Sequence, residues 1–522
     1  MLSRIISGGV VGVGACLIGV ETDMDRGLPA FSMVGSLSRE VCESRERVSV
    51  ALKNSGFSIP PSRLTVNLAP ADVHKEGTGF DLPIAVGILQ SMSYFASEKT
   101  DNILFVGELG LSGEVKKVRG VLPVVRAAAD AGISQCIVPV ANAAEGAVIP
   151  GIVVRGAESI GQVLEFLQAD TEQEREAIMP AATQNGAELL KEAVWDVEDF
   201  AQVQGQEVAK RAAEIAAAGF HNLLMIGPPG AGKTMIAERI PGIMPPLTLQ
   251  ESLEVTGIYS VAGLLQEGQA LMTKRPFWHP HHTISRAALT GGSLHPRPGL
   301  ISLSHRGILF MDELPEFGRG IIDSLRQPLE EHRVWLAKAG GNLSYPADFM
   351  LVCAMNPCPC GYYPDRNRCK CTEPQMIRYK GKVSGPIMDR IDLWVELQAV
   401  ALSELQNSMP NESSKVIRMR VERARRMQKE RFEGTEYRFN ADMKVGDLDY
   451  FCPLGKGEQK VMEQLYQSLG ISARAYHRIK KVARTIADLE GEERIREEHL
   501  LEAAGYRPNE MSVHPDVNPK EW

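Results

Sequence analysis

Residues 227–234 read Gly-Pro-Pro-Gly-Ala-Gly-Lys-Thr, and this stretch decides the fold. An apolar run, Leu223–Ile226, comes directly before it, and a helix-like run, Met235–Ile240, follows it. A strand, a glycine-rich loop and a helix in this order are typical of a phosphate-binding loop. Its glycines allow backbone N–H groups to curl around phosphates at the N-terminus of the helix. The sequence therefore predicts a nucleotide site, with a bare glycine-rich turn as the alternative.

Each part of this loop has an expected role in binding ATP and Mg²⁺. Lys233 would reach the outer phosphates, and the hydroxyl of Thr234 would bind Mg²⁺. The remaining residues would surround the phosphates with their backbone: Gly227, Pro228, Pro229, Gly230, Ala231 and Gly232.

Two acids follow a second apolar run and complete the pattern of a nucleotide hydrolase. Residues 307–311 read Gly-Ile-Leu-Phe-Met and lead directly into Asp312 and Glu313. Asp312 would hold Mg²⁺ through water, and Glu313 would orient and activate the attacking water. Two solvated acids at a strand end are the alternative.

Polar and cationic residues further along the chain fit the same chemistry. Asn356 ends a third apolar run and would sit between the γ-phosphate and the water, or close a turn before Pro357. Arg390 and Arg474 are candidates for stabilising transition-state charge, which needs a planar cation that keeps its proton. Each could instead form a surface ion pair. Spacing does not say which arginine acts in cis and which in trans.

Length and composition limit the class of protein. The chain has 522 residues, 44% of them hydrophobic and 23% charged, so we expect two to four globular domains. The net charge of −8 means that any contact with DNA needs a local basic patch. Five glycines interrupt the apolar run from Ile5 to Val20, which favours a strand-turn-strand over a signal peptide or a membrane span. Nine cysteines, an odd number, indicate a reducing cytoplasmic location.

The pattern along the chain divides it into five parts. Residues 1–167 alternate strand-like runs (64–68, 103–106 and 136–140) with helix-like runs (41–55, 83–92 and 122–131), which predicts an α/β domain. Residues 168–195 are polar and acidic and are predicted to be a linker. The nucleotide-binding core is expected over 196–400, a helical domain over 401–504 and a loose tail over 505–522.

Four cysteines form two closely spaced pairs. Cys358 and Cys360 are followed, after eight residues, by Cys369 and Cys371. This spacing suits four thiolates around a structural Zn²⁺, and free or redox-active thiols are the alternative. A catalytic zinc is not expected, because four thiolates leave no open position on the ion.

Two further stretches carry ionisable side chains. Residues 275–283 and 291–295 contain His279, His281, His282 and His295, which predict a packed loop near the nucleotide or a subunit contact, with metal or nucleic-acid contact left open. The run Lys415–Arg431 holds eight basic and two acidic residues. It predicts either a solvated helix face or contact with a phosphate backbone.

Several long motifs in order resemble the ComM/YifB family of magnesium-chelatase-like AAA+ ATPases of bacteria. They are residues 26–31, 43–48, 68–72, 80–85, 280–283, 311–317 and 482–489. The resemblance implies a P-loop core with a doubly wound parallel sheet, a helical lid and a ring, expected as a hexamer. It implies that Arg390 is the finger inserted into a neighbour's site, that Arg474 is the sensor in the lid, and that Gln206 flanks adenine.

The N-terminal domain resembles the fold shared by the Lon protease domain and ribosomal protein S5. By a rough alignment, residues 77–80 stand where the nucleophile serine would be and Val124 where the lysine would be, so we expect no peptidase activity. The family resemblance implies a helicase that promotes branch migration of DNA, branched or single-stranded, in natural transformation and recombination. The alternative is a chelatase-like chaperone that remodels a protein partner.

Overall fold

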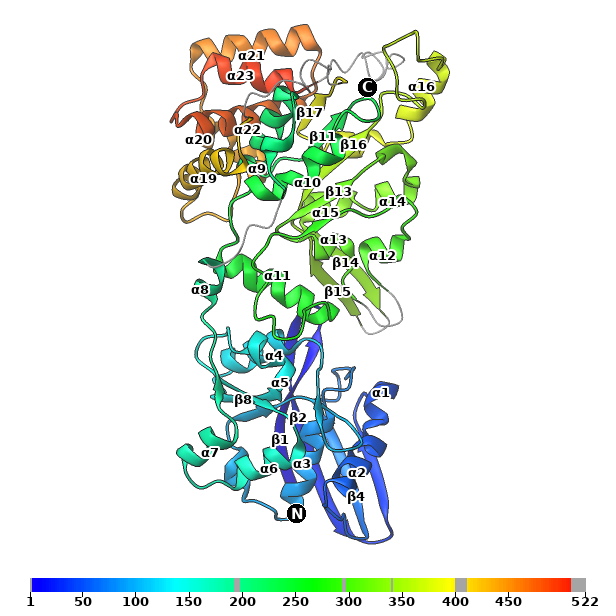
Figure 1. The fold of residues 1–522 in the computed structure, drawn as a ribbon, viewed down its shortest axis with the longest axis vertical. Helices are drawn as coiled ribbons and strands as arrows, with labels where there is room; N and C mark the ends of the chain where they lie inside the picture. The colour runs from blue at the N-terminus through cyan, green and yellow to red at the C-terminus, as the bar shows by residue number, and fades with distance from the viewer. Residues whose placement is uncertain (1, 192–197, 293–296, 339–340, 400–410, 508–522) are drawn as a thin grey trace.

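The computed structural model describes residues 2–191, 198–292, 297–338, 341–399 and 411–507. The molecule is elongated, with an α/β domain at one end and a second α/β domain at the other (Figure 1). A helical domain, the lid, packs beside the second α/β domain, which we call the core. The predicted order of α/β, α/β and helical parts is thus present.

The N-terminal domain is built on an eight-stranded sheet in the order β10-β9-β8-β5-β1-β2-β4-β3. β1 (Leu2–Val11) and β2 (Gly14–Arg26) form an antiparallel hairpin, which confirms the predicted strand-turn-strand. The other strands of the domain are β3 (Ala30–Val34), β4 (Ser62–Ala69), β5 (Ile103–Phe105), β8 (Gln135–Pro139), β9 (Val153–Ala157) and β10 (Ala181–Ala182), with β6 (Glu108–Leu109) and β7 (Val115–Lys116) in a separate pair.

Helices cover this sheet at the three predicted runs and also at residues 140–146 and 160–168, where the sequence predicts none. They are α1 (Arg39–Cys42), α2 (Ser44–Asn54), α3 (Asp81–Ser91), α4 (Val121–Asp130), α5 (Val140–Gly146) and α6 (Ile160–Gln168), with a 3₁₀ turn at Ser97–Thr100. Helix α3 is buried from Asp81 to Gln90, and the buried carboxylate of Asp81 accepts two hydrogen bonds from Arg47, at 2.7 and 2.9 Å. This pairing stabilises a charge that would otherwise be costly to bury.

The polar stretch predicted as a linker from residue 168 continues the N-terminal sheet. It contains α7 (Glu172–Ile178), β10 and α8 (Gly186–Lys191), and β10 pairs antiparallel with β9. Arg155 of β9 holds this stretch against the domain, because its side chain is 3% exposed and pairs with Glu172 at 2.7 Å and Glu176 at 2.6 Å. The acidic residues that indicate a solvated linker therefore neutralise one buried arginine. Residues 192–195 of the predicted linker lie outside the described part.

The core contains a five-stranded sheet in the order β12-β13-β16-β11-β17, and every neighbouring pair is parallel. The strands are β11 (Leu223–Ile226), β12 (Phe277–Trp278), β13 (Ile308–Met311), β16 (Met350–Met355) and β17 (Leu393–Glu396). β11, β13 and β16 are continuous apolar runs because helices cover both faces of such a sheet. Since the strands are parallel, the residues that follow β11, β13 and β16 meet at one edge.

The helices of the core are α9 (Glu207–Gly219), α10 (Lys233–Ile243), α11 (Leu249–Ala262), α12 (Arg286–Thr290), α13 (Leu300–Leu303), α14 (Arg319–Asp323), α15 (Arg326–Glu331), α16 (Glu373–Lys380) and α17 (Gly385–Met388). A hairpin, β14 (Arg333–Lys338) and β15 (Gly341–Pro346), lies between β13 and β16 in the chain. The core also contains 3₁₀ turns at Phe200–Gln202 and Leu314–Glu316. Helix α11 joins the core to the N-terminal domain: it packs on α4, and Lys117 donates to the carbonyl of Leu265 at 2.7 Å.

The lid consists of α19 (Ser414–Arg431), α20 (Leu448–Phe451), α21 (Lys456–Leu469), α22 (Ala473–Glu490) and α23 (Glu497–Gly505), with 3₁₀ turns at Asn440–Asp442 and Val445–Asp447. It shares one hydrophobic core with α9, and Phe220 stacks on Phe439 with ring centroids 4.5 Å apart.

The loose tail predicted over residues 505–522 does not begin at residue 505. Tyr506 accepts a backbone hydrogen bond from Trp394 at 2.9 Å, and Arg507 donates to Ile391, so these residues are bound to the core. Residues 508–522 lie outside the described part.

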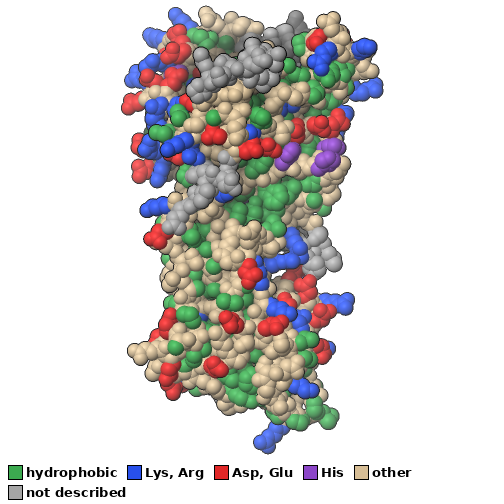
Figure 2. All heavy atoms as spheres, viewed as in Figure 1, with side chains coloured by type: hydrophobic (Ala, Val, Ile, Leu, Met, Phe, Trp, Pro, Cys, Tyr) green, Lys and Arg blue, Asp and Glu red, His purple; other side chains and the backbone are tan. Residues whose placement is uncertain are grey.

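The surface carries both signs of charge. Basic and acidic side chains are interspersed over the face in Figure 2, which agrees with a modest net charge of −8. Within the described ranges, no helix is both long enough and apolar enough to span a bilayer.

Asp488 is the centre of the lid's polar core. It is fully buried and accepts hydrogen bonds from Arg431 (2.9 Å), Arg484 (3.1 Å) and Asn440 (2.8 Å). We expect Asp488→Ala to lower the free energy of unfolding by about 3–5 kcal/mol, because the buried Arg484 and the half-buried Arg431 would lose their counter-charge. Urea denaturation measures this. Glu493→Ala, which removes an exposed carboxylate nearby, is the control, and equal stability of the two variants would contradict the prediction.

Candidate nucleotide site

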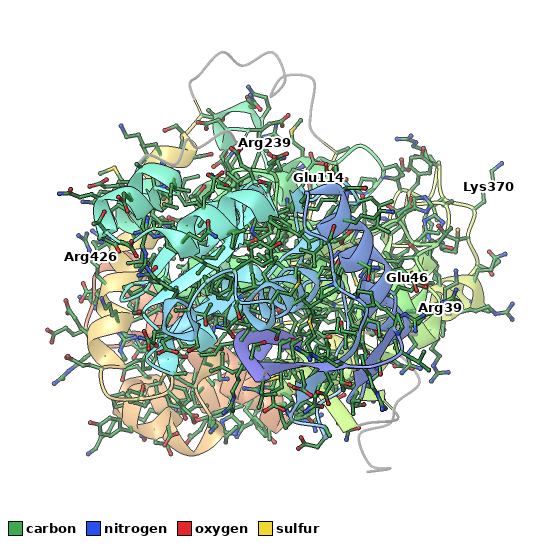
Figure 3. The ribbon with its side chains drawn as sticks, turned by 90° about the horizontal axis from the view of Figure 1, so that it is seen from below. Arg39, Glu46, Glu114, Arg239, Lys370 and Arg426 are labelled. Atoms are coloured by element: carbon green, nitrogen blue, oxygen red, sulfur yellow. The ribbon has the colours of Figure 1, made fainter. Side chains whose placement is uncertain are left out.

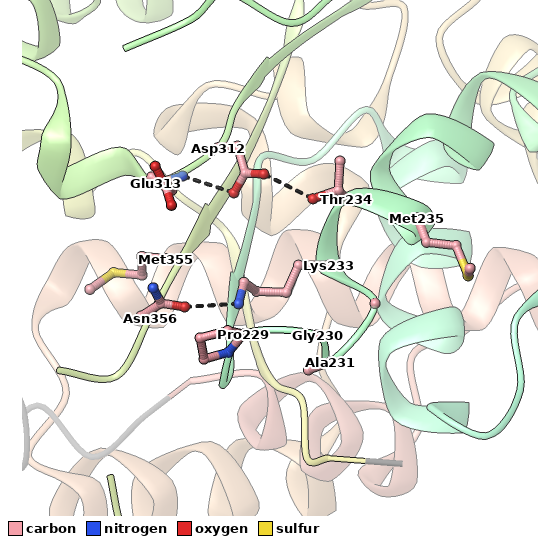
Figure 4. A pocket seen from close by; sticks show the side chains of 11 residues that line it. Pro229, Gly230, Ala231, Lys233, Thr234, Met235, Asp312, Glu313, Met355 and Asn356 are labelled. Carbon is pink, nitrogen blue, oxygen red and sulfur yellow. Dashed lines mark hydrogen bonds between the residues drawn. The ribbon is translucent and has the colours of Figure 1, made fainter. Parts of the chain in front are cut away.

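A pocket of about 340 Å³ lies at the carboxyl edge of the core sheet (Figure 4). Its lining brings together the three predicted motifs: residues 229–235 after β11, Asp312 and Glu313 after β13, and Met355 and Asn356 at the end of β16. β16 pairs with both β11 and β13, so Asn356 lies between the other two motifs. The order of the parallel strands therefore brings these three predicted motifs together.

The backbone of the loop has the shape that a phosphate needs. Gly230 and Gly232 have φ of +78° and +90°, which side chains rarely tolerate, and Gly232 caps the N-terminus of α10. Gly227 packs so closely on the segment after β17 that a Cβ would lie 2.7 Å from the carbonyl oxygen of Leu397. The loop therefore presents its N–H groups at a helix N-terminus, where an anion is favoured.

Lys233 lies inside the loop, 9% exposed. Its ammonium group donates to the carbonyls of Gly227 (2.6 Å) and Pro228 (3.0 Å) and to Oδ1 of Asn356 (3.1 Å). Burial lowers the pKa of Lys233, and the nearby charges of Asp312 and Glu313 oppose that shift. The side chain is thus a cation held beside the pocket by neutral oxygens, which an anionic phosphate can replace.

Two oxygens are positioned as ligands for a divalent ion. The hydroxyl of Thr234 donates to Oδ2 of Asp312 at 2.8 Å. The other oxygen of Asp312 accepts the backbone N–H of Glu313, also at 2.8 Å. Hydroxyl and carboxylate oxygens are the ligands that Mg²⁺ prefers, so the pair fits the predicted ion.

Glu313 has a strained backbone and an accessible carboxylate. Its φ of +51° is uncommon for a residue with a side chain, and its side chain is 56% exposed. The conformation turns the chain sharply after β13, and Glu313 lines the pocket.

Gln206 also reaches the loop. It precedes α9 with φ of +58°, and its side-chain amide donates to the carbonyls of Ala231 (3.1 Å) and Gln398 (2.6 Å). The predicted adenine-flanking residue thus bridges the phosphate-binding loop and the segment after β17.

The two predicted arginines do not line this pocket. Arg390 follows α17, where it pairs with Glu330 and donates to the carbonyl of Pro386. Arg474, at the start of α22, pairs with Asp389 at 3.0 Å. Burial lowers the pKa of Arg390, and the nearby charges of Arg326, Arg474 and Arg478 add to that shift. Both arginines therefore belong to one basic cluster outside the chain's own nucleotide pocket.

The sequence did not single out His282 as a neighbour of Glu313. Nδ1 of His282 lies 3.9 Å from Oε2 of Glu313, and its ring is 4.2 Å from that of His281. His279 packs on Phe310 of β13 at 4.7 Å. Of the alternatives for this loop, packing near the nucleotide pocket is the one observed. Strand order could have indicated it, because β12 pairs with β13. His295 lies outside the described residues.

The four predicted cysteines come together. The Sγ atoms of Cys358, Cys360, Cys369 and Cys371 all lie within 4.8 Å of one another. Sγ of Cys358 is 3.4 Å from that of Cys360 and 3.7 Å from that of Cys369, and all four are free thiols. Four thiolates at about 2.3 Å around a tetrahedral Zn²⁺ would have sulfur atoms roughly 3.8 Å apart. The donor set therefore fits this ion.

Helix α19 has a solvated face, one of the two alternatives predicted for its basic run, and it is also a packing element. Five of its arginines contact other parts of the protein. Three of them donate to backbone carbonyls: Arg418 to that of Gly242, Arg423 to that of Leu489 and Arg425 to that of Arg438. The other two form ion pairs: Arg420 with Glu214 and Glu412, and Arg431 with Asp488. Burial lowers the pKa of Arg425 to about 10. The exposed cations are Lys415, Arg423, Arg426 and Lys429, and Figure 3 places Arg426 at the rim of the molecule. Most of the positive charge is therefore used to hold the lid.

Comparison with known proteins now gives the family. The chain is 41% identical over 516 residues to the competence protein ComM of Haemophilus influenzae, with 97% of each chain covered. The chain belongs to the ComM/YifB family. It is also 40% identical to YifB of Escherichia coli over 97% of each chain, and 24% identical over 30% of its length to the magnesium-chelatase 67 kDa subunit of Heliobacterium mobile.

Three family descriptions match successive parts of the chain. "Subunit ChlI of Mg-chelatase" matches residues 20–142, "Magnesium chelatase, subunit ChlI" residues 199–405, and "Magnesium chelatase, subunit ChlI C-terminal" residues 411–507. The mixed α/β core with its parallel sheet and the helical C-terminal part agree with a magnesium-chelatase-like AAA+ fold. The nucleotide pocket lies within the second match.

Proposed function

We propose that this protein is an ATP-driven motor of the AAA+ class that acts on DNA. The observation that carries the proposal is the pocket in which Lys233, the Thr234–Asp312 pair, Glu313 and Asn356 converge. These residue types and positions are those of a nucleoside triphosphate hydrolase.

Each side chain has one task in the proposed hydrolysis. Lys233 exchanges its carbonyl partners for phosphate oxygens. Thr234 would hold Mg²⁺ directly and Asp312 would hold it through water, and the ion would supply positive charge beside the phosphates. Glu313 orients a water molecule and accepts its proton, and Asn356 holds that water in line with the γ-phosphate. Gln206 flanks the adenine.

We propose that the chain assembles into a ring, as a hexamer, in which Arg390 is the finger inserted into a neighbouring subunit's site and Arg474 is the sensor in the lid. Both lie in the cluster with Arg326 and Arg478, outside their own pocket. A subunit contact would place this cluster against the exposed carboxyl edge of the next subunit's sheet. ATP hydrolysis would then require assembly of the ring, and hydrolysis in one subunit would be coupled to the position of its neighbour.

DNA is the proposed substrate, in branched or single-stranded form, with branch migration in natural transformation as the proposed role. The similarity to a protein named for competence supports this. The test is ATP hydrolysis by the purified protein with and without such DNA. We expect stimulation that falls as salt rises, because contacts with phosphates release counterions. Hydrolysis indifferent to DNA but raised by a protein partner would favour the chelatase-like chaperone.

We also propose that Cys358, Cys360, Cys369 and Cys371 hold one structural zinc ion. Purified protein is then expected to contain about one zinc per chain, since four thiolates complete one tetrahedral site. Elemental analysis measures this. Cys369→Ser with Cys371→Ser should remove the ion, whereas Cys42→Ser, at an exposed cysteine elsewhere, should not. Full zinc content in the double variant would contradict the assignment.

The finer description of the domains is part of the proposal. We assign a doubly wound core to residues 196–400, a lid to 401–504 and an S5/Lon-like domain to the N-terminal part. Val124 supports a domain without peptidase activity: it is buried, and it packs so closely on Gly8 that a Cβ there would lie 2.6 Å from Val124 Cγ1. An apolar contact thus occupies the position aligned with the protease lysine.

A further inference from the structure

The cysteine loop, residues 358–371, leaves β16 directly beside the phosphate-binding loop. Only Asn356 and Pro357 separate the strand from Cys358. The far end of the loop is at the surface, where Lys370 projects from the molecule in Figure 3. One end is therefore in solvent and the other is at the nucleotide pocket.

Gly361 makes the contact between the two loops. Its backbone has φ of +84°, and its N–H donates to the carbonyl of Cys358 at 3.0 Å, which closes a tight turn over the first cysteine pair. A Cβ at this position would lie 2.6 Å from Cδ and 2.9 Å from Cγ of Pro229. It would also lie 3.7 Å from Cγ of Asn356. The turn therefore packs against the phosphate-binding loop with no space between them.

Asn356 also lies near the helix that follows the cysteine loop. The backbone of Asn356 lies near the hydroxyl of Tyr379 in α16, and Oδ1 of Asn356 accepts a hydrogen bond from the ammonium of Lys233 at 3.1 Å. Asn356 thus lies close to the segments on both sides of the four cysteines. Any disorder of that loop would reach both Pro229 and Lys233.

We propose that the zinc-bound cysteine loop braces the phosphate-binding loop, so that loss of the ion weakens nucleotide binding. The inference rests on the zinc site and the nucleotide site proposed above. Without an ion, nothing cross-links the four cysteines, and the turn at Gly361 loses the link that would hold it against Pro229. The metal then sets the affinity of a site that it does not touch.

The first test keeps the cysteines and disturbs only the contact. Gly361→Ala should retain zinc but raise the dissociation constant for a fluorescent ADP analogue by roughly tenfold or more, because the new methyl group overlaps Pro229. Gly268→Ala is the matched control, since Gly268 has φ of +75° with nothing within 4 Å of its Cβ position. Pro229→Ala combined with Gly361→Ala should recover part of the lost affinity, because the overlapping ring atoms are gone.

The second test removes the ion. Cys369→Ser with Cys371→Ser should lose zinc and bind the ADP analogue at least tenfold more weakly, with the far-ultraviolet spectrum of the folded protein retained. Loss of zinc with unchanged affinity, or unchanged affinity in Gly361→Ala, overturns the brace. Absence of zinc from the unaltered protein overturns the metal assignment. Failure of the unaltered protein to bind the analogue would instead overturn the nucleotide site, so the outcomes are distinguishable.

Discussion

Glu313→Gln is expected to reduce the rate of ATP hydrolysis by about 10²- to 10⁴-fold while ATP still binds. The amide keeps the size of the side chain but cannot accept a proton from water. Glu313 does not pair with Lys233 or Thr234, whose hydrogen-bond partners are the loop carbonyls, Asn356 and Asp312, so binding contacts should survive. The measurements are steady-state phosphate release and binding of a fluorescent ATP analogue.

Glu316→Gln provides the control for this variant. Glu316 lies three residues further on, is 44% exposed and pairs with Lys382 at 3.1 Å. Its loss should leave hydrolysis within about twofold of the unaltered rate, since an exposed pair contributes little. Comparable hydrolysis by Glu313→Gln and Glu316→Gln would show that another group activates the water.

Arg390→Ala is expected to lower hydrolysis by about 10³-fold or more, although the arginine does not line its own chain's pocket. The physical reason is that charge on the transferred phosphoryl group would lose its cation from the neighbouring subunit. Arg319→Ala, which removes an arginine that is 81% exposed, is the control and should hydrolyse ATP normally.

Mixing two inactive variants tests whether Arg390 acts in trans. In a mixed ring, an Arg390→Ala chain supplies an intact Glu313, and a neighbouring Glu313→Gln chain supplies an intact Arg390. Hydrolysis should therefore return on mixing, in proportion to the interfaces of that kind. Failure to recover activity, in mixtures that co-purify as one assembly, would place the arginine's action within its own subunit.

The sequence alone determined the local chemistry of the nucleotide site. The order of strand, glycine-rich loop and helix fixes where N–H groups, Lys233 and Thr234 must point, because these features depend on backbone geometry over a few residues. Apolar runs ending in Asp312 and Asn356 predicted two more strands, and parallel pairing confirmed that their ends meet. The cluster of four cysteines was also predicted from the sequence, because the two pairs are only eight residues apart, and their Sγ atoms do come together.

Only the tertiary structure decided how distant charges are used. The acidic stretch after residue 168 reads as solvated, yet Glu172 and Glu176 neutralise the buried Arg155. The basic run of α19 predicts a solvated helix face or contact with a phosphate backbone, yet most of its arginines bind carboxylates and carbonyls of the core and lid. The contact between Gly361 and Pro229 also depends on the tertiary structure, because it joins segments more than 130 residues apart in the sequence. Periodicity and composition report what a segment can bury or expose, whereas the partner of a charge depends on which segments the fold brings together.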